Sequence, residues 1–193
     1  MRIAPLSALA ALALLPACAA TIPPVEVTRF HLGQGIAPAR VETAAVAGLD
    51  GGSIEFRTYA IAVQRELTRM GFGEGAPSAY RAEIGFDRDT REQLARRSPV
   101  SIGIGGGSFG RNFGFGLGTS FGVGGSRSRD IVVTRLSVRL VRKIDNVTVW
   151  EGRAETEAPN RAPAAQPGLA AEKLSRALFA GFPGESGRTI TVE

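Results

Sequence analysis

The sequence predicts an α+β protein: a two-layer sandwich in which two helices cover one face of a mainly antiparallel sheet of about four strands. Three observations lead to this prediction. Segments with the two-residue period of a strand stand on both sides of the first helical segment. Two segments carry the longer period of an amphipathic helix. A turn signal at Asp145-Asn146 joins two further strand segments into a hairpin.

The N-terminal third contains a strand, a weaker strand and the first helix. Apolar and polar residues alternate over residues 25–32, and a short strand is expected over residues 40–46. Ser53 is a good N-cap for a helix over residues 54–70, and Gly71 is suited to end it. Apolar residues fall on one stripe of this helix: Phe56, Ala60, Val63, Leu67 and Met70.

The middle of the chain is expected to hold two strands. Residues 80–87 alternate as a half-buried strand, and residues 87–99 form a polar connection with a turn of helix around 91–96. Residues 130–142 carry the clearest strand pattern. Its apolar face consists of Val132, Thr134, Leu136, Val138 and Leu140.

The C-terminal part is predicted to complete the hairpin and add the second helix. The returning strand covers residues 147–157, with Trp150 expected to anchor the core between sheet and helix. A Pro/Ala loop follows, and then an amphipathic helix over residues 168–182, in which Leu169, Leu174 and Phe182 are expected to pack on the sheet. The tail is expected to be short and polar.

The N-terminus has the features of an export signal that ends at a cysteine. Arg2 precedes an apolar run too short to span a bilayer, and Leu15, Ala17 and Cys18 resemble a bacterial lipobox. The resemblance implies cleavage after a signal peptide of residues 1–17 and acylation of Cys18. The alternative is an ordinary signal peptide with an incidental cysteine. Residues 18–24 would form the lipidated tether, and Ala19 resembles the sorting pattern of outer-membrane lipoproteins.

The remaining residues 25–193 are expected to form a single domain. The formal net charge is +5, and arginines are scattered along the chain rather than gathered in a run. This pattern does not favour nucleic acid as a partner. Cys18 is the only cysteine and His31 the only histidine, so neither a disulfide nor a metal site is expected, and no cofactor motif stands out.

A glycine-rich insertion covers residues 101–126, and 11 of the 23 residues from 103 to 125 are glycine. One interpretation is a flexible excursion at the edge of the sheet. The other is an extended hairpin with one bulky and one bare face, which would meet a partner or a lipid interface. The candidate partner-binding residues on the bulky side are Phe109, Phe113, Phe115, Leu117 and Phe121.

Catalytic motifs occur only in weak form. The insertion matches G-x-S-x-G twice and G-x-G-x-x-G once, but without the strand and helix that these motifs need. Acid/base chemistry would have to use carboxylates such as Asp87, Asp89 and Asp130. The first two flank a loop, where turn or cap roles are expected. His31 is expected to be a surface or half-buried polar residue.

Several short segments, in this order, carry a family resemblance: Thr58-Tyr59 to Leu67, Gly71-Phe72, Tyr80 to Ile84, Val147 to Gly152 and Leu178 to Pro183. Together with the lipobox they resemble a bacterial lipoprotein family named domain of unknown function 4136. This family has no assigned reaction, so the resemblance implies no catalytic residue.

Three functions are consistent with these features. The leading hypothesis is a non-enzymatic envelope lipoprotein, anchored through Cys18 to the periplasmic face of the outer membrane, that binds a protein or another envelope component. The second is a hydrolase-type enzyme acting on lipid or cell-wall material. The third is a subunit of a membrane-inserted assembly, formed through the glycine-rich segment.

Overall fold

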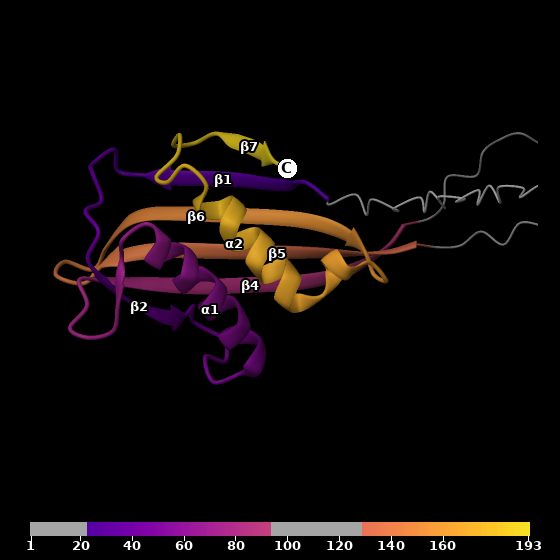
Figure 1. The fold of residues 1–193 in the computed structure, drawn as a ribbon, viewed down its shortest axis with the longest axis horizontal. Coiled ribbons are helices and arrows are strands. Elements are labelled where there is room, and N and C mark those ends of the chain that lie inside the picture. Colours follow the sequence, from indigo (N-terminus) through magenta and orange to yellow (C-terminus); the bar gives the residue numbers. More distant parts are fainter. Residues whose placement is uncertain (1–22, 94–128) are drawn as a thin grey trace, which may run out of the picture.

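The computed structural model describes residues 23–93 and 129–193, and these residues form an α+β fold (Figure 1). One sheet carries two helices on one face, as predicted. The sheet is still mainly antiparallel, but it is larger than the predicted four strands and is parallel at one edge. The described residues form a seven-stranded sheet in the order β3-β2-β4-β5-β6-β1-β7, and β2 pairs in parallel with both β3 and β4.

The described residues contain two helices, a 3-10 turn and seven strands. The helices are α1 (Ile54–Arg69) and α2 (Pro167–Phe179), and a 3-10 turn η1 (Pro163–Ala165) precedes α2. The strands are β1 (Val25–His31), β2 (Arg40–Ala45), β3 (Gly73–Glu74), β4 (Tyr80–Gln93), β5 (Arg129–Arg142), β6 (Val147–Pro159) and β7 (Thr189–Val192).

The long antiparallel strands β4, β5 and β6 form the centre of the sheet. β4 was predicted to end near Asp87 and to give way to a polar connection, but it continues to Gln93. Its polar second half is held by pairing with β5 along the whole strand. The side chains on the uncovered sheet face also find partners, since Asp87 pairs with Arg135. Residues 94–99 of the predicted connection lie outside the described residues.

The parallel edge and the last strand are the main additions to the prediction. The chain passes from β2 through α1 back to β4, so these two strands run in the same direction, as in a βαβ unit. The tail was expected to be only short and polar, but Thr189–Val192 forms β7 against β1. This pairing places β1 inside the sheet.

Both helices bury the faces that their sequences predict. Ser53 Oγ accepts from the Phe56 amide at 3.0 Å, which confirms the N-cap. Gly71 has φ +90°, and the amides of Gly71 and Phe72 bond to the carbonyls of Thr68 and Leu67, so α1 ends in a Schellman motif. The prediction that Leu169 packs on the sheet is wrong, because its side chain is 47% exposed.

One end of the sheet gathers several chain ends, and we call it the tether end. The described chain begins there at Pro23, stops at Gln93 and resumes at Arg129 (Figure 1). Gln93 lies opposite Arg129, and Val25 lies opposite both Thr156 and Val192. No helix within the described ranges 23–93 and 129–193 is long and apolar enough to cross a bilayer.

Candidate functional site

An apolar groove of about 750 Å³ lies at the tether end. We call it the tether groove. α2 forms one wall, the loop around η1 forms another, and the ends of β1 and β7 complete it. Its volume lies within the range of small-molecule pockets, roughly 300–1,000 Å³. The side chains that line it are mostly small and apolar, among them Ala162, Pro163, Leu169, Ala177 and Ala180.

Local sequence explains why the groove is open. The loop after β6 is rich in proline and alanine, so few side chains project into the space beside α2. The loop is held against the sheet, since Ala165 is buried against Val132 of β5 and Ala158 of β6. Arg88 Nη2 also donates to the Ala165 carbonyl at 2.8 Å. The loop is therefore fixed at a distance from the helix that small side chains do not fill.

The rim of the tether groove carries charges of both signs. Lys173 Nζ donates to the Pro23 carbonyl and, at 3.2 Å, to Thr156 Oγ1. Burial lowers the pKa of Lys173, and the negative charge of Glu193 acts in the opposite direction. Arg176 and Glu172 add an exposed base and an exposed acid on α2.

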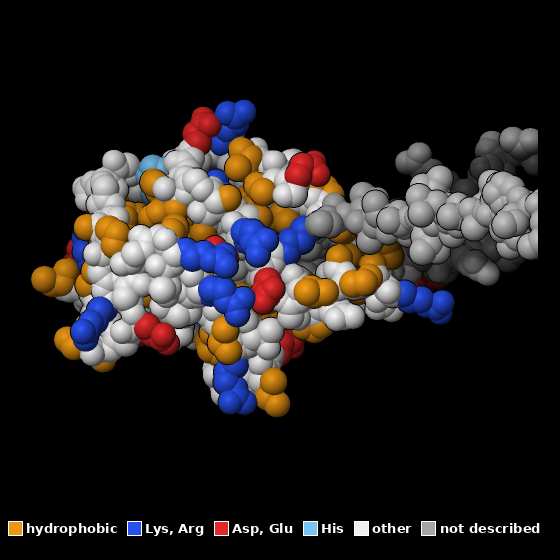
Figure 2. All heavy atoms as spheres, in the orientation of Figure 1, with side chains coloured by type: hydrophobic (Ala, Val, Ile, Leu, Met, Phe, Trp, Pro, Cys, Tyr) orange, Lys and Arg blue, Asp and Glu red, His pale blue; other side chains and the backbone are white. Residues whose placement is uncertain are grey.

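A shallower groove of about 400 Å³ lies beside the first one and shares Leu169 and Glu172 with it. It runs between the two helices, where Ile61 is 60% exposed and Arg65 forms an ion pair with Glu172 at 2.8 Å. Figure 2 shows hydrophobic side chains on this face near the point where the described chain begins, with basic and acidic groups beside them. An amphipathic surface therefore continues from the tether groove over α2.

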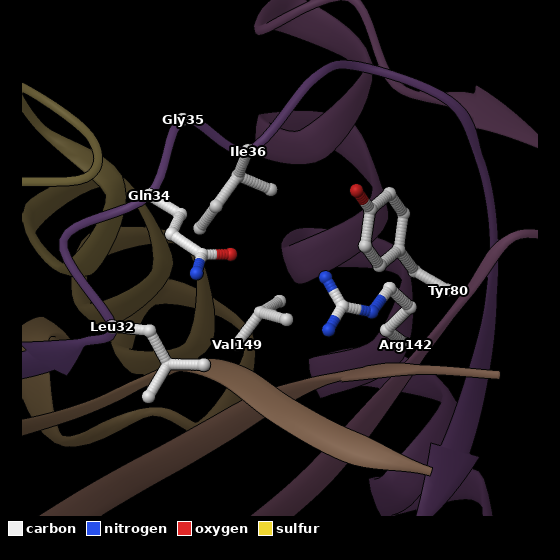
Figure 3. A pocket seen from close by; sticks show the side chains of 7 residues that line it. All are labelled: Leu32, Gln34, Gly35, Ile36, Tyr80, Arg142 and Val149. Carbon is white, nitrogen blue, oxygen red and sulfur yellow. The ribbon is translucent and has the colours of Figure 1, made fainter. Parts of the chain in front are cut away.

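A small pocket at the opposite end of the sheet is shown in Figure 3. Its volume is about 20 Å³, which is room for about one water molecule. The Arg142 guanidinium faces it, and the same side chain donates to both carboxylate oxygens of Asp145 at 2.8–3.1 Å. This pocket therefore lies between the connection that follows β1 and the neighbouring ends of β4, β5 and β6, and it is too small for an organic ligand.

The carboxylates considered for acid/base chemistry are placed within strands or at their ends. Asp87 and Asp89 were predicted as turn or cap residues, which is wrong, because both lie inside β4. Asp87 pairs with Arg135 at 3.0 Å and Asp89 with Arg91 at 3.7 Å. Asp130 lies exposed at the start of β5. Among the described residues, no three His, Cys, Asp or Glu side chains are grouped to hold a metal ion.

His31 and Trp150 have structural contacts, as predicted. His31 is half-buried, with Nε2 3.2 Å from the Gly184 carbonyl and Nδ1 accepting from the Gly33 amide. Trp150 is buried, stacks on Phe179 with ring centroids 5.3 Å apart, and donates from Nε1 to the Pro183 carbonyl. The indole therefore anchors α2 and the segment after it to β6.

The residues that the sequence proposed for function lie outside the described residues. These are Cys18 and the candidate partner-binding set Phe109, Phe113, Phe115, Leu117 and Phe121, together with the weak catalytic motif matches. Conversely, sequence reasoning missed the tether groove. The available signal was the Pro/Ala loop followed by a helix whose first large apolar residue, Leu169, stands off the buried stripe.

Comparison with known proteins identifies one clear relative. Uncharacterized protein ZMO1243 of Zymomonas mobilis subsp. mobilis is 30% identical to this chain over 213 residues, covering 88% of the chain and 80% of that protein. The chain belongs to the family of this protein. No family model matches the sequence.

Two solved structures resemble the fold at low sequence identity. A PDZ domain protein from Parabacteroides distasonis superposes with a TM-score of 0.51 at 9% identity, covering 88% of this chain and 39% of that one. The chain thus spans about two fifths of that protein, and the likeness concerns the fold alone. The PelC dodecamer from Paraburkholderia phytofirmans has a TM-score of 0.41 at 10% identity, covering 84% of this chain and 99% of that one.

Proposed function

We propose that the protein is a non-enzymatic lipoprotein of the cell envelope, anchored through acylated Cys18 to the periplasmic face of the outer membrane. It binds an envelope component at the tether end. The observation that supports this most strongly is the position of the tether groove, which opens beside Pro23. The resemblance to domain of unknown function 4136 is compatible with this proposal and stays a prediction.

The length of the tether relates the groove to the membrane. Pro23 is five residues after Cys18. Five extended residues span at most about 18 Å. An acyl anchor on Cys18 would therefore hold the tether groove, and the amphipathic surface beside it, close to the lipid headgroups. Two or three acyl chains are enough for a stable anchor.

The glycine-rich segment is proposed as a second contact. The described chain leaves at Gln93 and returns at Arg129, which lie side by side at the tether end. A partner of the aromatic residues Phe109 to Phe121 would then be reached from the same end of the domain. In vivo photo-crosslinking from residues 109 to 123 identifies what this segment contacts. The proposal is contradicted if a chain with residues 101–126 deleted still co-purifies with every partner that was captured in this way.

The anchor is tested by a Cys18→Ala variant expressed in a bacterial host. We expect loss of palmitate labelling and release from the membrane fraction, because the thiol that carries the diacylglyceride is gone. Thr21→Ala, in the same tether, is the matched control and should keep both. Retention of palmitate and membrane fractionation by Cys18→Ala would remove the anchor from the proposal.

A further inference from the structure

We propose that the tether groove binds one acyl chain of a zwitterionic phospholipid, with the phosphate and ammonium of its headgroup at the charged rim. This deepens the proposed function and rests on it for the source of the lipid, which is the membrane that holds the protein. Lipid binding as such requires no acyl group on Cys18. The two proposals can therefore fail independently.

The lining of the groove suits a hydrocarbon chain. Its walls offer alanine, proline, valine and leucine side chains along an open channel between α2 and the η1 loop. Among the described residues that line it there is no aromatic side chain, so these residues offer no stacking surface for a flat ring. Apolar contact over its length would remove a flexible methylene chain from water, which is favourable in proportion to the area buried.

The basic side of the rim suits a phosphate. An ammonium group has three donors, and within the described residues Lys173 Nζ uses two of them, on Pro23 and Thr156. One donor is thus available for a ligand oxygen. Arg176 lies about one helical turn after Lys173 on α2 and is exposed. Its planar guanidinium binds phosphate oxygens well.

The acidic side of the rim decides the kind of headgroup. Glu193 is close enough to Lys173 to affect its pKa. Glu172, which also pairs with Arg65 at 2.8 Å, lines the same groove. A purely anionic ligand, such as a fatty acid or phosphatidylglycerol, would meet these carboxylates without a positive charge of its own. A zwitterion such as phosphatidylethanolamine places a phosphate near the bases and an ammonium near the acids.

The charges of the rim favour a membrane lipid over the protein's own acyl chains. Those chains would reach the groove through Cys18 but carry no phosphate or ammonium, so they would match the apolar lining and not the charged rim. A phospholipid of the bilayer surface matches the rim as well as the lining. Occupation by the protein's own acyl chain is therefore the competing outcome of the test.

The test uses the full chain carrying Cys18→Ser, which has no acyl group of its own. The probe is phosphatidylethanolamine with a fluorophore on one acyl chain, presented in phosphatidylethanolamine vesicles, and transfer to the protein is followed by fluorescence. We expect saturable binding that is weaker with a phosphatidylglycerol probe. Ala180→Trp, which fills the groove from an exposed position, should weaken binding about tenfold or more.

Matched controls separate the groove from general effects on the protein. Ala37→Trp adds the same indole at an exposed position at the far end of the sheet and should leave binding unchanged. Arg176→Glu should weaken phosphatidylethanolamine binding severalfold, whereas Arg57→Glu, exposed on α1, should not. Thermal unfolding of each variant shows that it is folded.

Three results would overturn the inference. One is that the phosphatidylethanolamine probe binds equally well to the Cys18→Ser chain with and without Ala180→Trp. Another is tighter binding of phosphatidylglycerol than of phosphatidylethanolamine, which would contradict the zwitterionic headgroup. The last is a pair of observations. The probe does not bind to Cys18→Ser, and Leu169 is protected from chemical labelling only in the protein that carries its acyl group. That result would assign the groove to the protein's own acyl group.

Discussion

Two buried polar side chains, Arg29 and Tyr59, differ in whether their polar atoms have hydrogen-bond partners. Arg29 is 4% exposed and donates from Nε and Nη2 to the carbonyls of Leu178 and Ala177, each at 2.8 Å. These carbonyls belong to the last turn of α2, where the helix provides no donors and has a negative dipole end. A residue of β1 thus caps α2 and joins the two layers.

Tyr59 has no such partner. Its ring is fully buried and stacks on Phe86, with centroids 4.3 Å apart and planes 7° apart. Its hydroxyl has no hydrogen-bond partner among the described residues. Burial raises the pKa of Tyr59 to about 12, because the phenolate would be desolvated.

Replacing Tyr59 with phenylalanine is expected to stabilise the protein. The ring contact is kept and an unpaired hydroxyl is removed, so the free energy of unfolding should rise by about 1 kcal/mol. Urea denaturation near neutral pH measures this. Tyr80→Phe, at the other tyrosine, is the control. A clear loss of stability in Tyr59→Phe would show that the hydroxyl is hydrogen-bonded in solution.

The same residue predicts how stability depends on alkaline pH. The pKa of Tyr59 in the folded protein, about 12, lies above the ordinary tyrosine value of 10.0. The neutral form is therefore favoured by folding, and its contribution is complete below pH 10 and is lost as pH rises toward 12. Tyr59→Phe should decline less over this interval than the parent chain. Equal declines would contradict the assignment.

At the scale of elements, the contact between α2 and β6 depends on a residue without a side chain. A Cβ at Gly152 would lie 2.6 Å from Trp150 Cη2 and 2.7 Å from Leu178 Cδ1. Both of those groups are fully packed. The close approach of helix and sheet therefore requires glycine here.

Gly152→Ala is expected to lower the free energy of unfolding by about 1–3 kcal/mol, because the indole or the helix must move. Gly168→Ala, in the first turn of α2, is the matched control. A Cβ there meets nothing within 4 Å, so this substitution should leave stability unchanged or raise it by up to about 1 kcal/mol. Similar unfolding midpoints for the two variants would contradict the packing argument.

Elements with local signals were predictable from the sequence, and those held by distant partners were not. Ser53 marks the start of α1 through its side-chain oxygen and Gly71 marks the end through its backbone amide, so the bounds of α1 followed from a few residues. The second half of β4 has polar residues on both faces and is a strand because β5 lies beside it. β7 is only four residues long and depends on pairing with β1.

At the scale of the whole molecule, the sheet face opposite the helices is covered by ion pairs. Arg135 lies between Asp87 at 3.0 Å and Glu155 at 2.6 Å, so it links β4, β5 and β6. Glu83 lies between Arg81 at 3.0 Å and Arg139 at 2.5 Å. The charged side chains of the uncovered face thus neutralise one another in pairs across β4, β5 and β6.

Acid is expected to weaken two further carboxylate interactions, those of Glu42 and Asp145. Hydrogen bonds from Lys143 and Ser78 lower the pKa of Glu42, and one from Arg142 lowers the pKa of Asp145. Both carboxylates therefore stabilise the fold at pH values above their ordinary pKa values of 4.5 and 3.8, and this contribution is lost as pH falls through their lower pKa values in the folded protein. Urea denaturation at descending pH should show this loss, and the double variant Glu42→Gln, Asp145→Asn should show less. An unchanged slope in the double variant would contradict the assignment.

The tether groove could not be predicted from the sequence, because it is formed by segments that are distant in the chain. Its walls come from β1, the η1 loop, α2 and β7, which are far apart in the chain, and its emptiness results from where they are held. Periodicity shows which face of α2 is buried. It does not show that Ala177 and Ala180 line an open groove together with Ala162 and Pro163.

The pairing of Gln93 with Arg129 has a consequence for how this family can vary. Because β4 and β5 fix these two positions side by side, the ends of the intervening stretch are joined by the sheet whatever its length. The entropy of closing such a stretch rises only with the logarithm of its length, by about 0.6 kcal/mol for each doubling. The stretch between Gln93 and Arg129 can therefore vary in length and sequence within the family with little effect on folding. A foreign peptide grafted between these two residues would be displayed at the tether end.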